Sequence, residues 1–375
     1  MKTLLILLFA LSVGQCNEDE ELLLVQEDKK LIENIEEGDL LENDKPLNWP
    51  WRGIVSSPRD TSVINERIIK ELKTQGIDAI RLVVEVKRFS IKNNVSVEVG
   101  MDQHLQWVEK VIQWCAKEDI VVILHSKDFP LDPLKNFNHT SSEFWESEIE
   151  LNAAISYIND LVLKFDKYPN VVAYDFFSEP VVKSIFGPKR PEIWFDFFNR
   201  ILNTIRVHSN KYVVFSPGPW GMAKGYSDFK EPFDDNKIIY GFHFYNPDAY
   251  THQGIKKRTE VFNYPGQIGK IYWDKNRIRD NMNVAVNWAK EHNKLLYVGE
   301  FSVVRWAEGK DQYLEDVLNV LEENKLGYTY HSLNNWKGWD MNYEEVIKGS
   351  KKLIKITEKT RTRQILENFW KLNGQ

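Results

Sequence analysis

Short, continuously apolar runs alternate with amphipathic runs along most of the chain. Eight apolar runs are rich in β-branched and aromatic residues and predict strands over residues 52–55, 79–84, 120–125, 171–177, 212–216, 238–245, 295–301 and 327–332. Between them, apolar residues recur at helical spacing and predict helices over residues 63–75, 102–117, 151–165, 193–208, 277–292 and 313–323. Repeated strand-then-helix units over residues 46–375 predict a single α/β domain, a (β/α)₈ TIM barrel.

A doubly wound open sheet is the alternative fold for this pattern. It would be expected to carry a glycine-rich phosphate-binding turn after an early strand, and the sequence has none there. The barrel makes a specific demand, because the active site of such barrels lies at the carboxyl ends of the strands. Polar residues at the predicted strand ends are therefore the candidate functional residues.

The first 45 residues differ from the rest of the chain. Residues 1–16 have a charged start at Lys2, a short apolar run and small residues near Cys16, which predicts a secretory signal peptide and a secreted, extracellular protein. The alternative is that Cys16 carries a lipoprotein anchor. Residues 17–45 are acidic and predict a linker. The apolar run is too short for a membrane span, and no later segment is long enough to be one.

Charge and composition narrow the class of partner. The net charge is −6, which argues against nucleic acid. The acidity is concentrated in residues 17–46, whose net charge is −9, whereas residues 47–375 carry a net charge of +2. Aromatic residues make up 13% of the chain and include 13 Trp. Wide aromatic faces in loops suit sugar rings, so this excess favours a carbohydrate ligand.

Cysteine usage and two sequons add little to the functional picture. Once a signal peptide is removed, Cys115 is the single thiol, and its place in a helical pattern predicts a small buried apolar residue. Asn94 and Asn138 begin N-glycosylation sequons in polar, loop-like stretches. Whether they are glycosylated depends on the host's secretory pathway.

Two carboxylates stand at the ends of predicted strands. Glu179 follows the fourth strand in VVAYDFFSEP, and Glu300 ends the seventh in LLYVGEFSVV. In a barrel these ends face each other across one mouth. Glycoside hydrolysis needs one proton donor and one nucleophile or base around the anomeric carbon. The pair therefore predicts a glycosidase active site.

Further polar residues mark other strand ends. His243 and Tyr245 share one face of the sixth strand, and a phenol beside a carboxylate can hold it ionised and aimed. Arg81, on the second strand, could do the same from the other side. His125, ending the third strand, could bind a sugar hydroxyl.

Tryptophans follow several of the same strands. The eighth strand and its loop supply His331, Trp336 and Trp339, and we predict Trp336 as the floor of the sugar site. Trp220 follows the fifth strand and Trp306 the seventh. For these two and for Trp339, packing within the loops is an equal alternative to sugar binding.

Residues 46–345 resemble glycoside hydrolase family 5, the cellulase family. The matching pieces, in order, are Arg81, His125, the Glu179–Pro180 pair, His243-x-Tyr245, Gly299-Glu300-Phe301 and Trp336. The resemblance implies a retaining endo-β-glycosidase, an endoglucanase on a β-1,4-glucan, in which Glu179 is the acid/base and Glu300 the nucleophile. It also implies that no metal or organic cofactor is used. Two carboxyl groups about 5 Å apart would fit the retaining reaction.

The sequence departs from the family in two places. The family has Asn before the acid/base, where it holds the substrate's 2-hydroxyl, but this chain has Ser178. Ser offers a shorter side chain with one hydroxyl, which weakens a contact that matters in the transition state. In the branch this chain resembles, an Arg-Glu pair precedes the eighth-strand Trp, but here Asn334 and Asn335 stand in its place.

Other readings stay open at this point. Ser178 is compatible with a non-catalytic carbohydrate-binding homologue. The motifs also fit a hydrolase or transglycosylase that acts on mannan, xylan or another β-glycoside, because loop shape sets the substrate. We expect a monomer, and the sequence does not separate endo from exo action.

Overall fold

The computed structural model describes residues 45–58, 63–126, 129 and 140–373. The predicted signal peptide, most of the acidic linker, Cys16 and Asn138 therefore lie outside the described residues. Asn94 is exposed and ends a helix in a left-handed conformation, with φ of 54°. Cys115 is fully buried with a free thiol, as its helical setting predicted.

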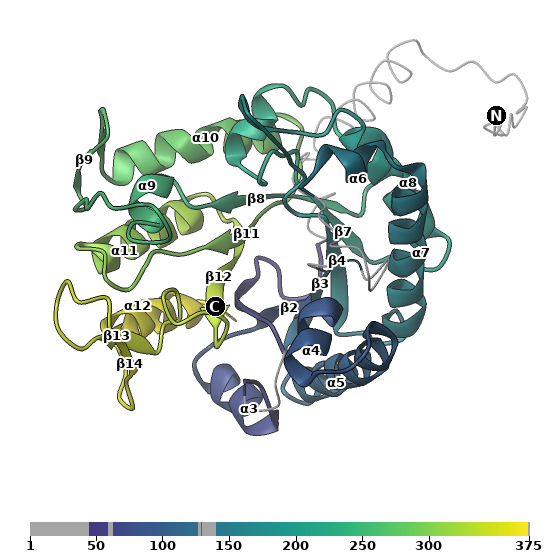
Figure 1. Ribbon diagram of the computed structural model, residues 1–375, viewed down its shortest axis with the longest axis horizontal. Helices are drawn as coiled ribbons and strands as arrows, with labels where there is room; N and C mark the ends of the chain where they lie inside the picture. The colour runs from purple at the N-terminus through teal and green to yellow at the C-terminus, as the bar shows by residue number, and fades with distance from the viewer. Residues whose placement is uncertain (1–44, 59–62, 127–128, 130–139, 374–375) are drawn as a thin grey trace, which may run out of the picture. The chain divides into compact units, whose positions relative to one another are not determined.

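Eight parallel strands close into a barrel in the order β1-β12-β11-β8-β7-β4-β3-β2, which confirms the predicted fold and rules out an open sheet (Figure 1). Each barrel strand coincides with a predicted run to within one residue at either end. The barrel strands are β1 (Arg52–Ser56), β2 (Ala79–Val84), β3 (Val121–Ser126), β4 (Val171–Phe176), β7 (Tyr212–Phe215), β8 (Ile238–Phe244), β11 (Leu296–Phe301) and β12 (Gly327–Leu333).

Helices surround the barrel, and the six predicted ones are all present (Figure 1). They are α3 (Glu66–Thr74), α5 (Val97–Lys117), α7 (Glu148–Phe165), α8 (Trp194–Arg206), α10 (Lys275–Glu291) and α11 (Lys310–Glu323). The sequence reading missed α4 (Val86–Asn93), α6 (Ser142–Glu146), α9 (Asp248–Thr251) and α12 (Arg361–Trp370), and the 3₁₀ helix η1 (Ala223–Ser227). It also missed three short hairpins, β5–β6 (Val182–Ser184, Gly187–Lys189), β9–β10 (Gly266–Ile268, Ile271–Trp273) and β13–β14 (Tyr343–Glu345, Leu353–Lys355).

The strands are apolar throughout because both of their faces are buried. In β3, Val122 and Leu124 pack into the larger core, which also includes the apolar faces of the helices, while Val121 and Ile123 belong to a second cluster. This second cluster also contains Ala79, Ala173 and Ile239 from three other strands, so it lies inside the barrel. The two-residue period of a strand thus assigns alternate residues to the two cores.

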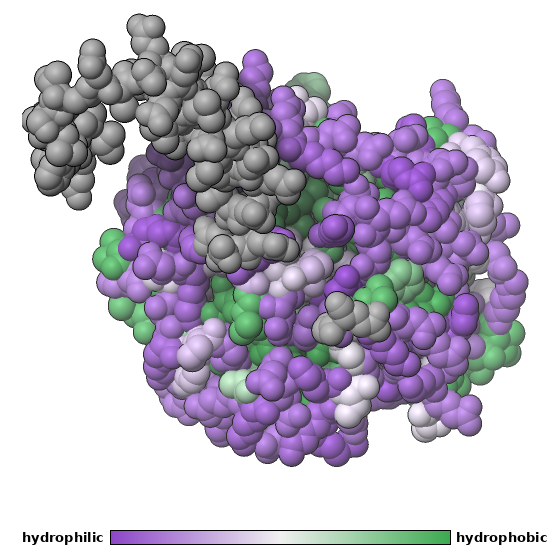
Figure 2. All heavy atoms as spheres, turned by 180° about the vertical axis from the view of Figure 1, so that it is seen from behind, coloured by the Kyte–Doolittle hydropathy of each residue, from purple (hydrophilic) through white to green (hydrophobic). Residues whose placement is uncertain are grey.

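Serine, threonine, asparagine and aspartate cap several helices. Asn65 accepts a hydrogen bond from Ile68 N at the start of α3, and Asp274 accepts one from Arg277 N at the start of α10. Hydrophilic residues dominate the face in Figure 2, with hydrophobic residues in separate patches. Within the described part of the chain, no helix is long and apolar enough to cross a membrane.

Candidate active site

The inward row of side chains changes character toward the carboxyl ends of the strands. Inside the barrel, Ala79 is followed two residues later by Arg81, Ile123 by His125 and Ala173 by Asp175. Because alternate residues of a strand share a face, these polar side chains also point into the barrel, next to the apolar interior cluster and nearer the carboxyl ends of the strands. The apolar cluster thus packs beneath a polar layer at the mouth of the barrel, where such barrels position their catalytic groups.

Glu300 reaches the barrel mouth through a β-bulge. Tyr297 pairs with Gly241 and Val298 with Phe242, yet Glu300 pairs with His243, so Gly299 is an extra residue in β11. Strict alternation would place Glu300 on the face opposite Tyr297. The bulge shifts the alternation by one residue and turns the carboxylate inward, next to His243.

Glu179 is presented by a sharp turn at the end of β4. Phe177 has a left-handed backbone with φ of 57°, which is uncommon for a bulky residue and typical of functional turns. Its ring is anchored by stacking on Phe129, with ring centroids 4.1 Å apart. The turn leaves Ser178 buried, whereas the Glu179 side chain is 36% exposed and opens to the cleft.

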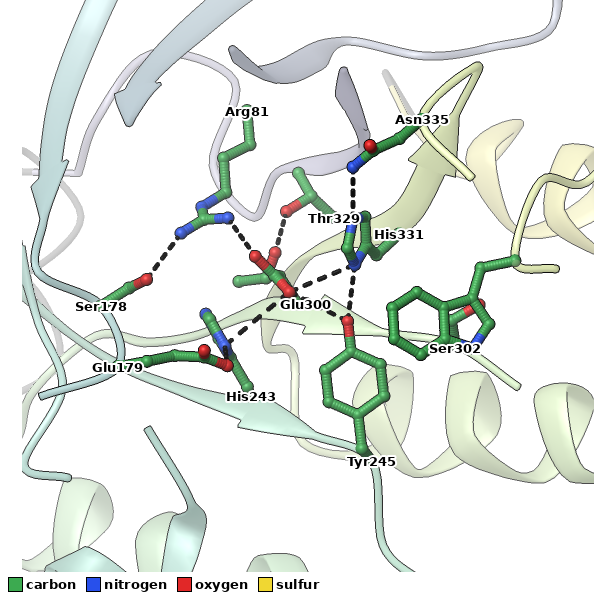
Figure 3. Close-up of polar contacts among 12 residues, drawn as sticks. Arg81, Ser178, Glu179, His243, Tyr245, Glu300, Ser302, Thr329, His331 and Asn335 are labelled. Atoms are coloured by element: carbon green, nitrogen blue, oxygen red, sulfur yellow. Dashed lines mark hydrogen bonds and ion pairs between the residues drawn. The ribbon is translucent and has the colours of Figure 1, made fainter. Parts of the chain in front are cut away.

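Four side chains surround the Glu300 carboxylate (Figure 3). Arg81 Nη1 donates to Oε1 at 2.7 Å, and Tyr245 OH donates to Oε2 at 2.9 Å. His331 Nδ1 lies 3.2 Å and His243 Nδ1 3.9 Å from Oε2. Both carboxylate oxygens are thus held, and the side chain is fixed in one orientation.

The same contacts keep Glu300 ionised. Burial alone would raise the pKa of Glu300, but His331, His243 and Arg81 together hold this pKa well below its usual range. Burial and the neighbouring carboxylates of Glu300 and Glu179 raise the pKa of Tyr245 well above its usual range, so its phenol keeps its proton and remains a donor.

Glu179 is joined to this group through His243. His243 Nδ1 lies 2.9 Å from Glu179 Oε1, and a carboxylate oxygen of Glu179, one of Glu300 and a nitrogen of His243 all lie within 4.8 Å of one another. These three donors are also of the types that bind divalent cations. Arg81, however, already supplies a positive charge to Glu300. The site therefore holds two facing carboxyl groups in different environments: Glu300 is buried, and Glu179 is partly exposed.

Two cavities meet at this pair. A cavity of about 620 Å³ is lined by Glu179, Glu300, His331, Trp220 and Trp339 among others. A smaller cavity of about 210 Å³ is lined by His125, Ser178 and Phe177, and shares Glu179, Glu300 and Trp220 with the first. The carboxylates therefore lie where the two cavities join, with room for a molecule on both sides.

The predicted tryptophans separate into two groups. Trp220 and Trp339 line the larger cavity, and Trp339 stacks on Tyr245 with ring centroids 5.3 Å apart. Trp336 and Trp306 line neither of the two cavities at the carboxylate pair. Trp336 instead packs edge-on between Trp339 and Trp306, at centroid distances of 5.1 and 5.8 Å. Trp339 therefore lines the cavity beside the carboxylates, and Trp336, which is 40% exposed, contacts it edge-on. That Trp336 forms the floor of the sugar site stays a prediction.

The sequence reading gave no role to three residues of the network. Asp175 accepts a hydrogen bond from Arg81 Nε at 2.7 Å, and both side chains are buried. His331 Nδ1 lies 2.7 Å from Tyr245 OH, and Asn335 Nδ2 lies 3.0 Å from His331 Nε2. The sequence does carry a signal for Asp175, because it is a charged residue inside the otherwise apolar strand β4.

Comparison with known proteins identifies the family. The model of the cellulase family, glycosyl hydrolase family 5, matches residues 41–337. The chain belongs to this family. As a family 5 member it is a glycoside hydrolase that resembles endo-β-1,4-glucanases.

The relatives of this family 5 chain are distant, and several of them match over most of their length. Endoglucanase C of Acetivibrio thermocellus is 21% identical over 339 residues, which cover 82% of this chain and 95% of the relative. Cellodextrinase A of Ruminococcus flavefaciens is 20% identical over 262 residues, which cover 68% of this chain and 74% of the relative. Among solved structures, Thermotoga maritima Cel5A with cellobiose aligns with a TM-score of 0.63 at 16% identity, covering 85% of this chain and 98% of that one, which supports the fold.

Gly299→Ala is expected to lower kcat/KM by about tenfold, through a small displacement of His243. A Cβ at residue 299 would lie 3.1 Å from His243 Nε2, so the ring that contacts Glu179 must shift. The measurement is kcat/KM on a soluble β-glucan beside thermal unfolding. Gly241→Ala is the matched control, because its Cβ would press on Val214 below the site. Equal losses in both variants would contradict the prediction.

Proposed function

We propose that this protein is a retaining endo-β-1,4-glucanase in which Glu300 is the nucleophile and Glu179 the acid/base. The observation that carries the proposal is the separation of the two carboxyl groups, with one oxygen of each within 4.8 Å of the other. Retaining glycosidases have their carboxyl groups about 5–5.5 Å apart, whereas inverting enzymes need about 6.5–9.5 Å to admit a water. The endoglucanase relatives support the choice of substrate.

The environments of the two carboxyl groups suit the two roles. Glu300 is buried and held ionised by cationic and hydrogen-bond partners, so it can attack the anomeric carbon without losing a proton first. Glu179 is open to the cleft and can give its proton to the glycosidic oxygen as that bond breaks. It then takes a proton from a water, which attacks the anomeric carbon and releases the sugar from Glu300.

Arg81, Ser178, His243 and Tyr245 act in this proposal by holding the two carboxyl groups. Arg81 Nη2 donates to Ser178 Oγ at 3.0 Å, so the serine has a defined partner. Trp220 and Trp339 offer aromatic faces to sugar rings in the larger cavity, and His125 lines the smaller one. We also propose that the protein is secreted, on the pattern of residues 1–16.

Stereochemistry tests the proposal directly. Cellohexaose hydrolysis followed by ¹H NMR should release the β-anomer first, because two inversions restore the original configuration. An α-anomer as first product would overturn the retaining assignment.

Viscosity of a mixed-linkage β-glucan should fall faster than reducing ends appear, as internal cleavage requires. Binding without hydrolysis of glucan, mannan or xylan would favour the non-catalytic reading, and Ser178→Asn would be the next variant.

A further inference from the structure

Among the described residues, lysines gather on one side of the carboxylate pair and not on the other. Lys183, Lys256 and Arg258 line the larger cavity. An adjoining cavity of about 830 Å³ shares Pro188 and Met222 with it and adds Lys189 and Lys224. The described residues that line the smaller cavity beside His125 include no lysine or arginine.

Most of this positive charge has no protein partner. Arg258 is neutralised by Asp248 at 2.5 Å, and Arg190, in the adjoining cavity, by Asp228 at 2.7 Å. Among the described residues, the four lysines have no carboxylate within the 4.0 Å of an ion pair. They are all exposed: Lys183, Lys189, Lys224 and Lys256. Lys183 instead lies over the Trp220 ring, 5.2 Å from its centroid.

The position of Lys183 places a positive charge in the same cavity as the two carboxyl groups. Trp220 lines both cavities at the carboxylate pair and has a left-handed backbone with φ of 55°, a constraint that a bulky residue adopts at functional positions. The ammonium beside Trp220, with Lys256 in the same cavity, is placed to contact an anionic substituent on a sugar bound in that cavity. A neutral glucan would leave both lysines without an anionic partner.

We propose that this cleft takes a β-linked polysaccharide with anionic substituents, carboxylates or sulfate esters, on the sugars that occupy the larger cavity and its continuation past Pro188. This inference rests on the proposed function and refines its substrate. The lysines would hold the anionic part of the chain, while the smaller cavity, which has no described cationic residue, would take an unsubstituted sugar. Cleavage would then fall at the border between a substituted and an unsubstituted stretch.

Matched substrates test the proposal. The kcat/KM is measured on neutral cello-oligosaccharides, on the same oligosaccharides partly oxidised to C6 carboxylates, and on partly sulfated ones, at low and high salt. We expect the wild type to prefer an anionic series by about tenfold or more at low salt, and less at high salt, because salt screens the attraction. The carboxylate and sulfate series distinguish the two sources of charge.

The Lys183→Gln/Lys256→Gln double variant is expected to lower the ratio of anionic to neutral kcat/KM about tenfold. Lys70→Gln/Lys325→Gln removes two exposed lysines, one in α3 and one in the turn after α11, and should leave this ratio unchanged. A wild type that cleaves the neutral series as well as both anionic series overturns the inference but leaves the glucanase proposal intact. A ratio that falls equally in both double variants also overturns it, because only general charge would matter.

Discussion

Glu300→Gln should lower kcat on a cello-oligosaccharide by about 10⁴-fold or more while the protein stays folded and binds the sugar. Glutamine keeps the shape of the side chain. Its one amide oxygen can accept from Arg81, which contacts Glu300 Oε1 at 2.7 Å, and its NH₂ group can donate to Tyr245 OH, which contacts Oε2 at 2.9 Å. It has no charge with which to attack the anomeric carbon. Arg81 retains Asp175 as its counterion, so unfolding by urea should change little.

Calorimetry with cellohexaose checks that binding survives in this variant. A kcat within tenfold of the wild type would contradict the role given to Glu300. Glu179→Gln is the companion variant. The Glu179 side chain is only partly buried, so the substitution should leave the fold intact. Loss of the proton donor should slow the cleavage of substrates with poor leaving groups more than that of substrates with good ones.

Azide can then separate the two roles. In Glu300→Gly a small anion can enter the space left by the carboxylate and attack the anomeric carbon once, so an activated β-glycoside should give an α-glycosyl azide. In Glu179→Gly the covalent step remains, and azide would attack that intermediate to give a β-glycosyl azide. The opposite pattern of products would exchange the roles of the two residues.

The barrel could be predicted from sequence because its determinants are local. Strands buried on both faces leave continuous apolar runs, and helices between them show a 3.6-residue period. The short α6 (Ser142–Glu146) and α9 (Asp248–Thr251) were missed because five and four residues show no period. The hairpin β5–β6 spans three residues a strand, so no alternation identifies it.

The candidate site was predictable where a single residue type at a strand end suffices. Glu179, Glu300, Arg81, His243 and Tyr245 all come together as the strand ends predicted. For Trp336 a strand end is not sufficient, because its position depends on how the loop after β12 packs this ring against Trp306 and Trp339. The contact of Asn335 with His331 likewise depends on that loop. The bulge at Gly299 cannot be read from the sequence, since a glycine in a strand has several explanations.

Arg81→Met is expected to destabilise the fold by about 3–5 kcal/mol, the largest effect on stability that we predict. Arg81 is fully buried and joins Asp175, Ser178 and Glu300 through three of its nitrogens. Methionine fills a similar volume but leaves the two carboxylates buried without their cation. Urea unfolding monitored by tryptophan fluorescence gives the change in free energy.

The pH profile of the same variant tests the link between this arginine and catalysis. Arg81 is one of the groups that lower the pKa of Glu300, so its removal raises this pKa. The nucleophile must be ionised, and activity should therefore be lost more at acidic than at neutral pH, with the acidic limb of kcat/KM shifted upward. If the acidic limb of the kcat/KM profile does not move, the prediction is wrong, and His331 and His243 alone keep Glu300 ionised.

Adding Asp175→Asn to Arg81→Met separates the structural effect from the catalytic one. The second substitution removes one of the two orphaned carboxylates, so part of the lost stability should return. The acidic limb should stay shifted, because Glu300 still lacks its cation. Arg81 thus stabilises two carboxylates with different tasks: Asp175 anchors the guanidinium inside the barrel, and the guanidinium fixes the charge and direction of Glu300 at its mouth.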